Sequence, residues 1–281
     1  MDFWQHLPEK INPVLFQWGG LQLRWYGLMY GIAFVVVYGL TLYRLKREPL
    51  PFAQSTIDAF FGWAIAGVLV GGRLGYVLFY EPMMMIENPL GIFLPINWKG
   101  GVRFTGLSGM SFHGGLIGVA LVSLRFCRRR SINFWQLADL IVPAAPLGYT
   151  FGRLGNFLNG ELYGRPTTVP WGMYFPTDPT ALLRRPSQLY EAFFEGIVLF
   201  MLFWPLRRQR SLERLFLPLY LIGYGIVRFF IEFVRQPDAH LGTVLGPLTM
   251  GQVLCLAMIL GGAVPAVKLR RATPPNTSMT I

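Results

Sequence analysis

Charged side chains and possible metal ligands are scarce in this sequence of 281 residues. Only 14% of the residues are charged, against about a quarter in a typical soluble domain, while 53% are hydrophobic and 15% aromatic. The two cysteines, Cys127 and Cys255, lie in apolar stretches, and their spacing fits neither a metal site nor a disulfide framework. This composition excludes an ordinary soluble domain and indicates an integral membrane protein without a bound metal.

Acidic residues are few as well: 14 Asp and Glu stand against 25 Lys and Arg, which gives a formal net charge of +11. A basic protein can bind nucleic acid, but that function requires a folded basic face. Here the basic residues form short clusters between apolar runs. We therefore expect no nucleic-acid partner and assign the clusters to membrane topology.

Seven apolar runs are candidates for membrane-spanning helices, each of which needs about 20 residues. They cover about 25–43, 58–80, 111–126, 134–154, 187–205, 215–233 and 248–267. The third run is short, and Pro143 and Pro146 interrupt the fourth, so these two have the least defined boundaries. The pattern predicts an all-α integral membrane fold with seven transmembrane helices.

Basic clusters follow the first, third, fifth and seventh runs and predict their orientation. The clusters are Arg44/Lys46/Arg47, Arg125/Arg128/Arg129/Arg130, Arg207/Arg208/Arg210/Arg214 and Lys268/Arg270/Arg271. Because positively charged loops stay in the cytoplasm, the N-terminus is expected to be periplasmic and the C-terminus cytoplasmic. The connections at about 81–110, 155–186 and 234–247 then face the periplasm.

The two ends of the chain are predicted to lie outside the helical bundle. Residues 1–24 contain acids and a proline where a signal peptide has a basic end and a continuous apolar core. We expect them to form an interfacial arm on the membrane, with Trp4 and Trp18 among the lipid headgroups. The transmembrane catalytic domain covers 25–270, with a small periplasmic head at about 155–186, and 271–281 form a disordered cytoplasmic tail.

Ionisable and polar side chains inside membrane spans are energetically unfavourable and mark functional sites. In the predicted topology, such residues from six helices share the outer half of the bilayer. They are Tyr26, Arg73, Tyr76, His113, Arg153, Asn156, Gln188, Glu191, Tyr224, Arg228, Glu232 and Arg235. Asp58 and Asp139 instead lie near cytoplasmic helix starts, where a carboxylate complements the helix dipole.

Helical spacing places several of these residues on shared faces. One row is Tyr224, Arg228, Glu232 and Arg235; a second is Gln188, Glu191 and Glu195; a third is Arg153, Asn156 and Gly160, if that helix continues. The arginines outnumber the expected carboxylate partners, which leaves positive charge for a phospholipid phosphate that guanidinium groups bind in bidentate fashion. The alternative, which applies above all to Glu195 and Glu232, is that buried Arg–Glu pairs hold helices together.

His113 adds a titratable group at the mouth of the third predicted helix. Glycines at 114, 115 and 118 allow another helix or an acyl chain to approach the backbone closely. A single histidine is more often a hydrogen-bonded structural residue. Its expected place beside the arginines favours a catalytic or binding role.

Six motifs occur in order from the first predicted span to the sixth. They are WYGLMYGIAF at 25–34, GGRLGYVLFY at 71–80, MSFHGGLIG at 110–118, GRLGNFLNGELYGR at 152–165, RPSQLYEAFFEG at 185–196 and GYGIVRFFIEFVRQPDAH at 223–240. This set resembles the bacterial phosphatidylglycerol–prolipoprotein diacylglyceryl transferase family. Two departures are Arg185, where the family usually has histidine, and a longer segment between Trp98 and His113.

The resemblance implies an enzyme of the bacterial inner membrane that needs no cofactor. The expected reaction moves the diacylglyceryl group of phosphatidylglycerol to the lipobox cysteine of a prolipoprotein signal peptide. A thioether forms and glycerol phosphate is released.

The resemblance also implies roles for individual residues. Arg153 is expected to contact the lipid phosphate with Arg228 as a second clamp, and His113 is the candidate base for the thiol. The remaining substrate-binding positions are Tyr26, Arg73, Asn156, Glu161, Gly164, Glu191, Tyr224, Glu232 and Arg235. Among these, Glu191 and Glu232 are expected to orient the arginines.

Two other classes of protein share some of these features. A secondary transporter or anion channel also has several spans and intramembrane arginines, but its polar groups line a path to both faces or lie near the midplane. An intramembrane serine protease is suggested only by Ser108 within GLSG, and no later helix supplies a histidine because His240 lies in a loop.

Overall fold

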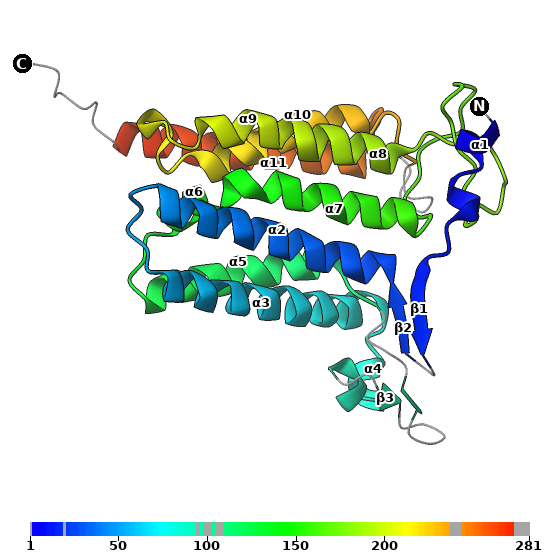
Figure 1. Cartoon of the computed structure of the whole chain (residues 1–281), viewed down its shortest axis with the longest axis horizontal. Helices are drawn as coiled ribbons and strands as arrows, with labels where there is room; N and C mark the ends of the chain where they lie inside the picture. The colour runs from blue at the N-terminus through cyan, green and yellow to red at the C-terminus, as the bar shows by residue number, and fades with distance from the viewer. Residues whose placement is uncertain are drawn as a thin grey trace, which may run out of the picture. The chain divides into compact units, whose positions relative to one another are not determined.

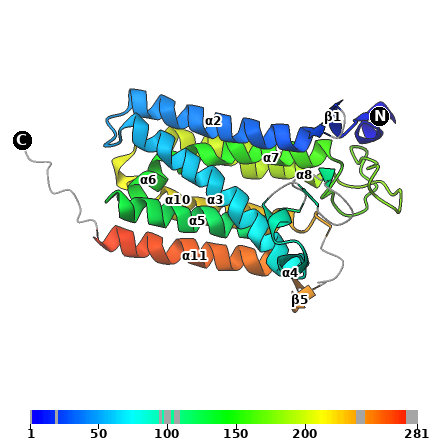
Figure 2. The same ribbon diagram turned by 90° about the horizontal axis from the view of Figure 1, so that it is seen from below.

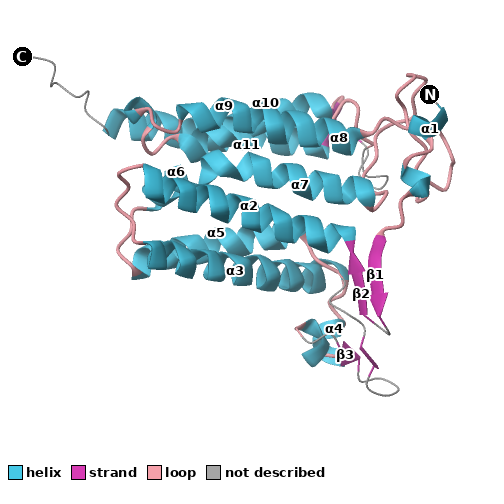
Figure 3. Ribbon diagram, in the orientation of Figure 1, coloured by secondary structure: helices cyan, strands magenta, loops and turns pink. Residues whose placement is uncertain are grey.

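Helices make up most of the described residues, and the strands among them form short two-stranded hairpins (Figure 3). A computed structural model describes residues 2–18, 21–93, 96–97, 103–104, 109–236 and 243–272. The chain divides into two compact units. Unit 1 comprises residues 1–16, 22–41 and 138–281, and unit 2 comprises residues 17–21 and 42–137.

All seven apolar runs are helical, as predicted. Five are continuous: α2 (Trp25–Arg47), α3 (Gln54–Tyr80), α5 (Phe112–Arg129), α10 (Phe216–Ile231) and α11 (Met250–Ala272). The fourth run consists of α6 (Phe134–Ile141), the 3-10 turn η3 (Val142–Ala144) and α7 (Ala145–Leu158), because the two prolines of this region cannot donate backbone hydrogen bonds. The fifth consists of α8 (Ser187–Glu191), the π-helical turn η4 (Ala192–Val198) and α9 (Leu199–Leu206).

Four of the described helical segments are long and apolar enough to cross a membrane. They are Trp25–Arg47, Gln54–Tyr80, Ser187–Leu206 and Met250–Arg271, and the apolar helix Phe216–Ile231 is shorter. These segments fit an integral membrane protein of the all-α class. Seven spans and their orientation stay predictions.

The connections and the N-terminal segment carry the small elements. These are α1 (Asp2–Gln5), η1 (Pro8–Lys10), β1 (Val14–Trp18), β2 (Leu21–Arg24), α4 (Met84–Glu87), η2 (Leu90–Ile92), β3 (Ile96–Asn97), β4 (Arg103–Phe104), η5 (Arg210–Leu212), β5 (Thr243–Leu245) and β6 (Leu248–Thr249). β3 pairs with β4, and β5 with β6, both in antiparallel fashion. Ser108, His240 and the tail from Thr273 lie outside the described residues.

Within unit 1, glycines allow close packing between helices. α2 lies alongside α7 (Figures 1 and 2), and a Cβ added at Gly148 of α7 would lie 2.5 Å from a methyl carbon of Val37. α10 and α11 run side by side in opposite directions, since Gly225 faces Ile259 while Gly262 faces the carbonyl of Pro218. This arrangement brings the end of α10 next to the beginning of α11.

Asp139 of α6 fixes the other end of α10. Its carboxylate accepts hydrogen bonds from the backbone N–H groups of Arg214 and Phe216, where α10 begins. The prediction that Asp139 complements a helix dipole therefore holds for a different helix from its own. Phe216 itself belongs to a core cluster with Val142, Leu199 and Phe203.

Within unit 2, α3 and α5 pack with their backbones nearly in contact. A Cβ on Gly71 would clash with the carbonyl oxygen of Gly114, and a Cβ on Gly118 with the carbonyl oxygen of Gly67. Small residues at this spacing are typical of tightly packed membrane helices. The glycines after His113 are expected to admit either another helix or an acyl chain. In the structure the neighbour is a helix, α3.

Candidate functional site

Glu191 occupies the centre of the polar cluster in unit 1. Glu191 is the last residue of the short helix α8, which begins after its N-cap residue Pro186, and the Glu191 side chain has 0% exposure. Its Oε2 lies 2.9 Å from Nε of Arg153 on α7, and its Oε1 lies 3.1 Å from Nη1 of Arg228 on α10. A carboxylate that is buried away from solvent needs cationic partners to stay ionised. Here the partners come from α7 and α10, so one carboxylate joins three helices.

Glu195 and Glu232 add two further carboxylates around Arg228. Oε1 of Glu195 lies 3.5 Å from Nη1 of Arg228, and Oε2 of Glu232 accepts a hydrogen bond of 3.0 Å from Nη2. Arg235 lies 3.9 Å from both Glu191 and Glu232. The π-helical turn η4 starts directly after Glu191 and contains Glu195, which is also fully buried.

The predicted excess of arginines over carboxylates is therefore wrong for this cluster. Arg153, Arg228 and Arg235 face three carboxylates, each of which lies near at least one of them. Linear spacing could not reveal this, because Glu191 is shared among all three arginines. Buried Arg–Glu pairing, the alternative weighed for Glu195 and Glu232, is what the structure shows.

Tyr149 is a member of the network that the sequence analysis missed. Its hydroxyl donates to Glu195 Oε2 in a short hydrogen bond and accepts one of 2.6 Å from Nε of Arg153. Its oxygen also lies 3.3 Å from the hydroxyl of Tyr224. Tyr149 stands four residues before Arg153, a spacing that could have revealed it, but within an apolar run it resembles a core residue.

Asn156 continues the network from Arg153 into the head. Asn156 Oδ1 accepts from Arg153 Nη1 at 3.4 Å, and Asn156 Nδ2 donates to Glu161 Oε1 at 2.8 Å. The chain can turn back and bring Glu161 to Asn156 because α7 ends at Leu158 and Gly160 adopts a φ of +69°. The expected helical row of Arg153, Asn156 and Gly160 is thus wrong at its last member.

Gly164 and Tyr26 lie at the borders of this network. Gly164 donates its N–H to the carbonyl of Arg185 at 2.8 Å and forms a bridge with Arg235; a Cβ there would lie 2.5 Å from the carbonyl oxygen of Val234. Tyr26, in the first turn of α2, packs near Gly155 and donates to Tyr30 at 3.2 Å. Unit 1 thus contains ten of the twelve predicted site residues. Nine of them lie at or beside one end of its helices, and Tyr224 lies in the middle of α10.

The other two predicted site residues, Arg73 and His113, belong to unit 2. Arg73 donates hydrogen bonds to the carbonyls of Gly91, Ile92 and Gly109, at 3.0, 2.7 and 3.1 Å. It therefore organises the segment that follows α3, and its contact with substrate stays a prediction. His113 is an exposed residue of the first turn of α5, which Ser111 caps by accepting from the N–H of Gly114.

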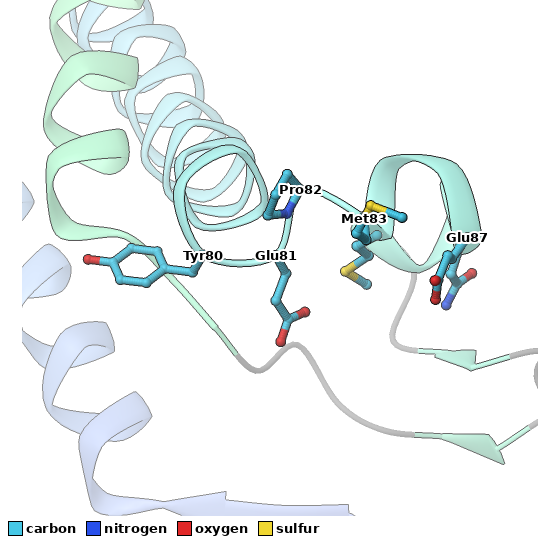
Figure 4. Close-up of a pocket in the computed structure, with 7 residues that line it drawn as sticks. Tyr80, Glu81, Pro82, Met83 and Glu87 are labelled. Carbon is cyan, nitrogen blue, oxygen red and sulfur yellow. The ribbon is translucent and has the colours of Figure 1, made fainter.

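Unit 2 also has an open hollow of about 430 Å³ at the turn from α3 to α4 (Figure 4). Its lining residues are Tyr80, Glu81, Pro82, Met83, Met84, Glu87 and Asn88, none of which is a predicted site residue. Within the described part of the chain, no group of three or more His, Cys, Asp or Glu side chains could hold a metal ion.

A model of the prolipoprotein diacylglyceryl transferase family matches residues 13–268. The chain belongs to this family. All ten site residues of unit 1 lie inside the matched range, as do Arg73 and His113.

Curated prolipoprotein diacylglyceryl transferases resemble the chain over most of its length. The phosphatidylglycerol–prolipoprotein diacylglyceryl transferase of Chlorobaculum tepidum is 55% identical over 261 residues, which cover 92% of this chain and 90% of that protein. The enzyme of the same name from Bordetella avium is 46% identical, covering 91% of this chain and 93% of that protein. That of Campylobacter jejuni is 42% identical, covering 92% and 94%.

A second buried ion pair stabilises the head of this transferase. Arg184 donates to both carboxylate oxygens of Asp178, at 2.6 and 3.1 Å, and also to Gln236 beyond α10 at 3.3 Å. Burial alone would raise the pKa of Asp178, but the hydrogen bonds from Arg184 and Thr180 hold that pKa well below its ordinary value. The pair ties the loop of the head to the segment that carries Arg235.

The depressed pKa of Asp178 predicts a pH-dependent contribution to stability. A carboxyl group with a lowered folded-state pKa stabilises the fold above its unfolded pKa of about 3.9, and this contribution is lost as the pH falls further. We expect Asp178→Asn to lower the free energy of unfolding at pH 7 by about 3 kcal/mol, as for a broken buried pair. The difference from the unsubstituted protein should shrink below about pH 4.

Thermal unfolding of the detergent-solubilised protein between about pH 3 and 7 measures this effect. Glu213→Gln, which removes an exposed carboxylate, is the control and should change stability little. A constant difference between Asp178→Asn and the unsubstituted protein over the whole pH range would contradict the prediction.

Proposed function

We propose that this chain transfers the diacylglyceryl group of phosphatidylglycerol to the thiol of a lipobox cysteine in a prolipoprotein signal peptide. Its membership of the prolipoprotein diacylglyceryl transferase family supports the reaction class, and the names of its relatives support the two substrates. The observation that carries the proposal is the pairing of Arg153 and Arg228 on one buried carboxylate, Glu191. It brings two guanidinium groups from different helices to one place.

The reaction exchanges one bond to a glycerol carbon for another. The peptide thiol loses its proton, and its sulfur attacks the carbon of the diacylglyceryl group that is bonded to the phosphate oxygen. A carbon–sulfur bond forms as this carbon–oxygen bond breaks, and the electron pair stays on the phosphate. The phosphodiester leaves as glycerol phosphate, a monoester with more negative charge than the substrate.

Arg153 and Arg228 are the proposed ligands of this phosphate. Cations fixed where negative charge develops stabilise the transition state more than the bound substrate. Arg153 can accept this role because its partners do not enclose it fully: 15% of its side-chain surface stays exposed. Glu191 and Glu232 orient the two guanidinium groups, and Arg235 adds charge beside them.

The remaining site residues are proposed to bind the rest of the lipid. Asn156 and Glu161 form a hydrogen-bonded pair that can meet glycerol hydroxyls, with Tyr26, Gly164 and Tyr224 around it. Arg73 is proposed to act from unit 2. No cofactor takes part in this proposal.

His113 is the proposed base for the thiol. A free cysteine has a pKa of about 8.5 and is mostly protonated at neutral pH, so a base has to take its proton, and a neutral imidazole can do so. The exposed position of His113 at the start of α5 is compatible with access to a peptide. The proposal also requires that His113 lies close enough to the arginines for both to act on one bound substrate.

We further propose that the chain is a multi-pass protein of the bacterial inner membrane with seven transmembrane helices. The N-terminus would face the periplasm, with 1–24 as an interfacial arm, 25–270 as the catalytic domain and 271–281 as a cytoplasmic tail. Support comes from the four apolar helices that are long enough to span a membrane and from the basic clusters after alternate runs. The site then opens to the outer leaflet, where the lipid substrate is present.

The transporter and channel alternative has less support. A transport path needs polar groups toward both faces or at the midplane. The ion pairs of Arg153, Glu191 and Arg228 instead gather toward one end of the unit 1 helices, near the end of α7, in α8 and in the last turn of α10.

The reaction itself predicts a mass change on a peptide. We expect the purified protein to add one diacylglyceryl group to a synthetic lipobox peptide when phosphatidylglycerol is present in mixed micelles. Mass spectrometry measures the adduct, and the same peptide with Ser in place of the lipobox Cys is the control. Absence of the adduct with folded protein, together with solute flux in liposomes, would support the transporter alternative instead.

The topology predicts which side of the membrane each loop faces. A cysteine replacing the exposed Leu182 should react with a membrane-impermeant maleimide added to the periplasmic side of intact cells. Arg130→Cys, at an exposed position in a basic cluster, should react only after permeabilisation, and the native cysteines are buried. The reverse pattern would refute the proposed orientation.

The proposed roles of the arginines and of His113 predict different pH–rate profiles. Arg153→Lys and Arg228→Lys should each reduce the rate by about 10²–10³, because an ammonium group cannot replace a bidentate guanidinium. His113→Gln should reduce the rate most near neutral pH and recover partly above the thiol pKa of about 8.5, where the peptide ionises unaided. The lysine variants should not recover, since higher pH supplies no stabilisation of the leaving phosphate.

Rates measured between about pH 6.5 and 9.5 distinguish these cases, a range that spans the unperturbed thiol pKa. Arg130→Lys, at an exposed position, is the matched control and should keep its activity. If His113→Gln stays equally inactive over the whole range, general-base catalysis is the wrong role for this residue.

A further inference from the structure

Glu232 has a second set of contacts that the proposed mechanism does not use. One oxygen, Oε2, faces Arg228 at 3.0 Å, while the other, Oε1, lies 3.3 Å from Oγ1 of Thr249. The Glu232 side chain is 3% exposed and Thr249 is 6% exposed. The carboxylate is therefore held between an arginine of the site and the residue directly before α11.

The hydroxyl of Thr249 is oriented by a capping box. The N–H of Gln252 donates to Thr249 Oγ1 at 3.3 Å, and the N–H of Thr249 donates to Gln252 Oε1 at 3.1 Å. A hydroxyl that accepts a hydrogen bond at the helix start still has its own hydrogen to donate. Glu232 Oε1 is the acceptor within reach.

Gly251 lets this carboxylate lie against the first turn of α11. A Cβ at position 251 would lie 2.5 Å from Oε1 and 3.0 Å from Oε2 of Glu232, closer than such atoms approach. Any other residue would have to displace the carboxylate or the helix. The start of a helix also favours a nearby negative charge.

We propose that Thr249 and Gly251 are positioning residues that hold Glu232, and through it the guanidinium of Arg228, in the orientation that receives the lipid phosphate. Arg228 has Glu191 on Nη1 and Glu232 on Nη2. Because Thr249 and Gly251 hold Glu232 on the side away from Arg228, the guanidinium group has little freedom to change its orientation. Charge that is fixed in this way before the reaction stabilises the transition state. This inference rests on the proposed function of Arg228.

Steady-state kinetics on four single variants test the proposal. Thr249→Val has a similar shape but no hydroxyl, whereas Thr249→Ser keeps it. Gly251→Ala adds the displacing methyl group, and Gly261→Ala is its control in the same helix, where a Cβ would meet no atom within 4 Å. The rate of transfer to a lipobox peptide is measured against the mole fraction of phosphatidylglycerol, which separates kcat from KM.

We expect Thr249→Val and Gly251→Ala to lower kcat about tenfold, as for loss of one hydrogen bond to a charged group, with KM changing less than about threefold. Thr249→Ser and Gly261→Ala should stay within about twofold of the unsubstituted enzyme. Loss of helix capping alone would lower the melting temperature of Thr249→Val without this selective fall in kcat.

Normal kcat in Thr249→Val or Gly251→Ala would overturn the proposal, as would a Thr249→Ser enzyme as slow as Thr249→Val. If Thr249→Val does not fold, Gly251→Ala against Gly261→Ala still decides. An unsubstituted protein that transfers no lipid contradicts the proposed function itself, an outcome separate from the failure of these variants.

Discussion

The ion pairs of Glu191 are the interaction on which the site of this protein depends. Its carboxylate has no exposed surface and lies within 3.1 Å of guanidinium groups from two other helices. Burying any one of these charges alone would be strongly unfavourable, so each is stable only while the others are in place. The requirement fixes the relative rotation of α7, α8 and α10, and thereby the place where Arg153 and Arg228 meet.

A cluster with matched charges can still bind a phosphate. A guanidinium carries five N–H donors, and a carboxylate that pairs with one edge leaves the others available. What the carboxylates supply is orientation: Glu191, Glu195 and Glu232 surround Arg228 from α8, η4 and the end of α10. Positive charge held in a fixed direction needs no rearrangement when negative charge develops on the leaving group.

Glycine has a repeated function in both units, which is to let backbone or charge approach without an intervening Cβ. Gly71 and Gly114 bring α3 and α5 into backbone contact in unit 2. In unit 1, Gly164 admits the carbonyl of Val234 and Gly251 admits the carboxylate of Glu232. The same absence of a side chain thus serves helix packing in one unit and the polar site in the other.

The sequence alone determined the helical nature of the chain, the family and most of the polar residues that the structure gathers around Glu191. An apolar run of about 20 residues can satisfy its backbone in a membrane only as a helix, so the seven helical segments followed from composition and length. The motifs around Arg153, Glu191 and Arg228 named the family that the comparisons confirmed. These features are local, and local features can be read from the order of residues.

Tertiary structure decided which groups meet. Arg228 meets Glu232 through their i, i+4 spacing at the end of α10. Whether Arg228 also pairs with Glu191 and Glu195 depends on the rotation and depth of different helices, which linear spacing does not fix. Sequence analysis did not select Tyr149 or Thr249, because both stand in apolar stretches and Tyr149 had only its spacing to Arg153 to mark it. The fold places a carboxylate beside the hydroxyl group of each. Hydrogen bonds between helices act over about 3 Å, so they are settled only when the helices pack.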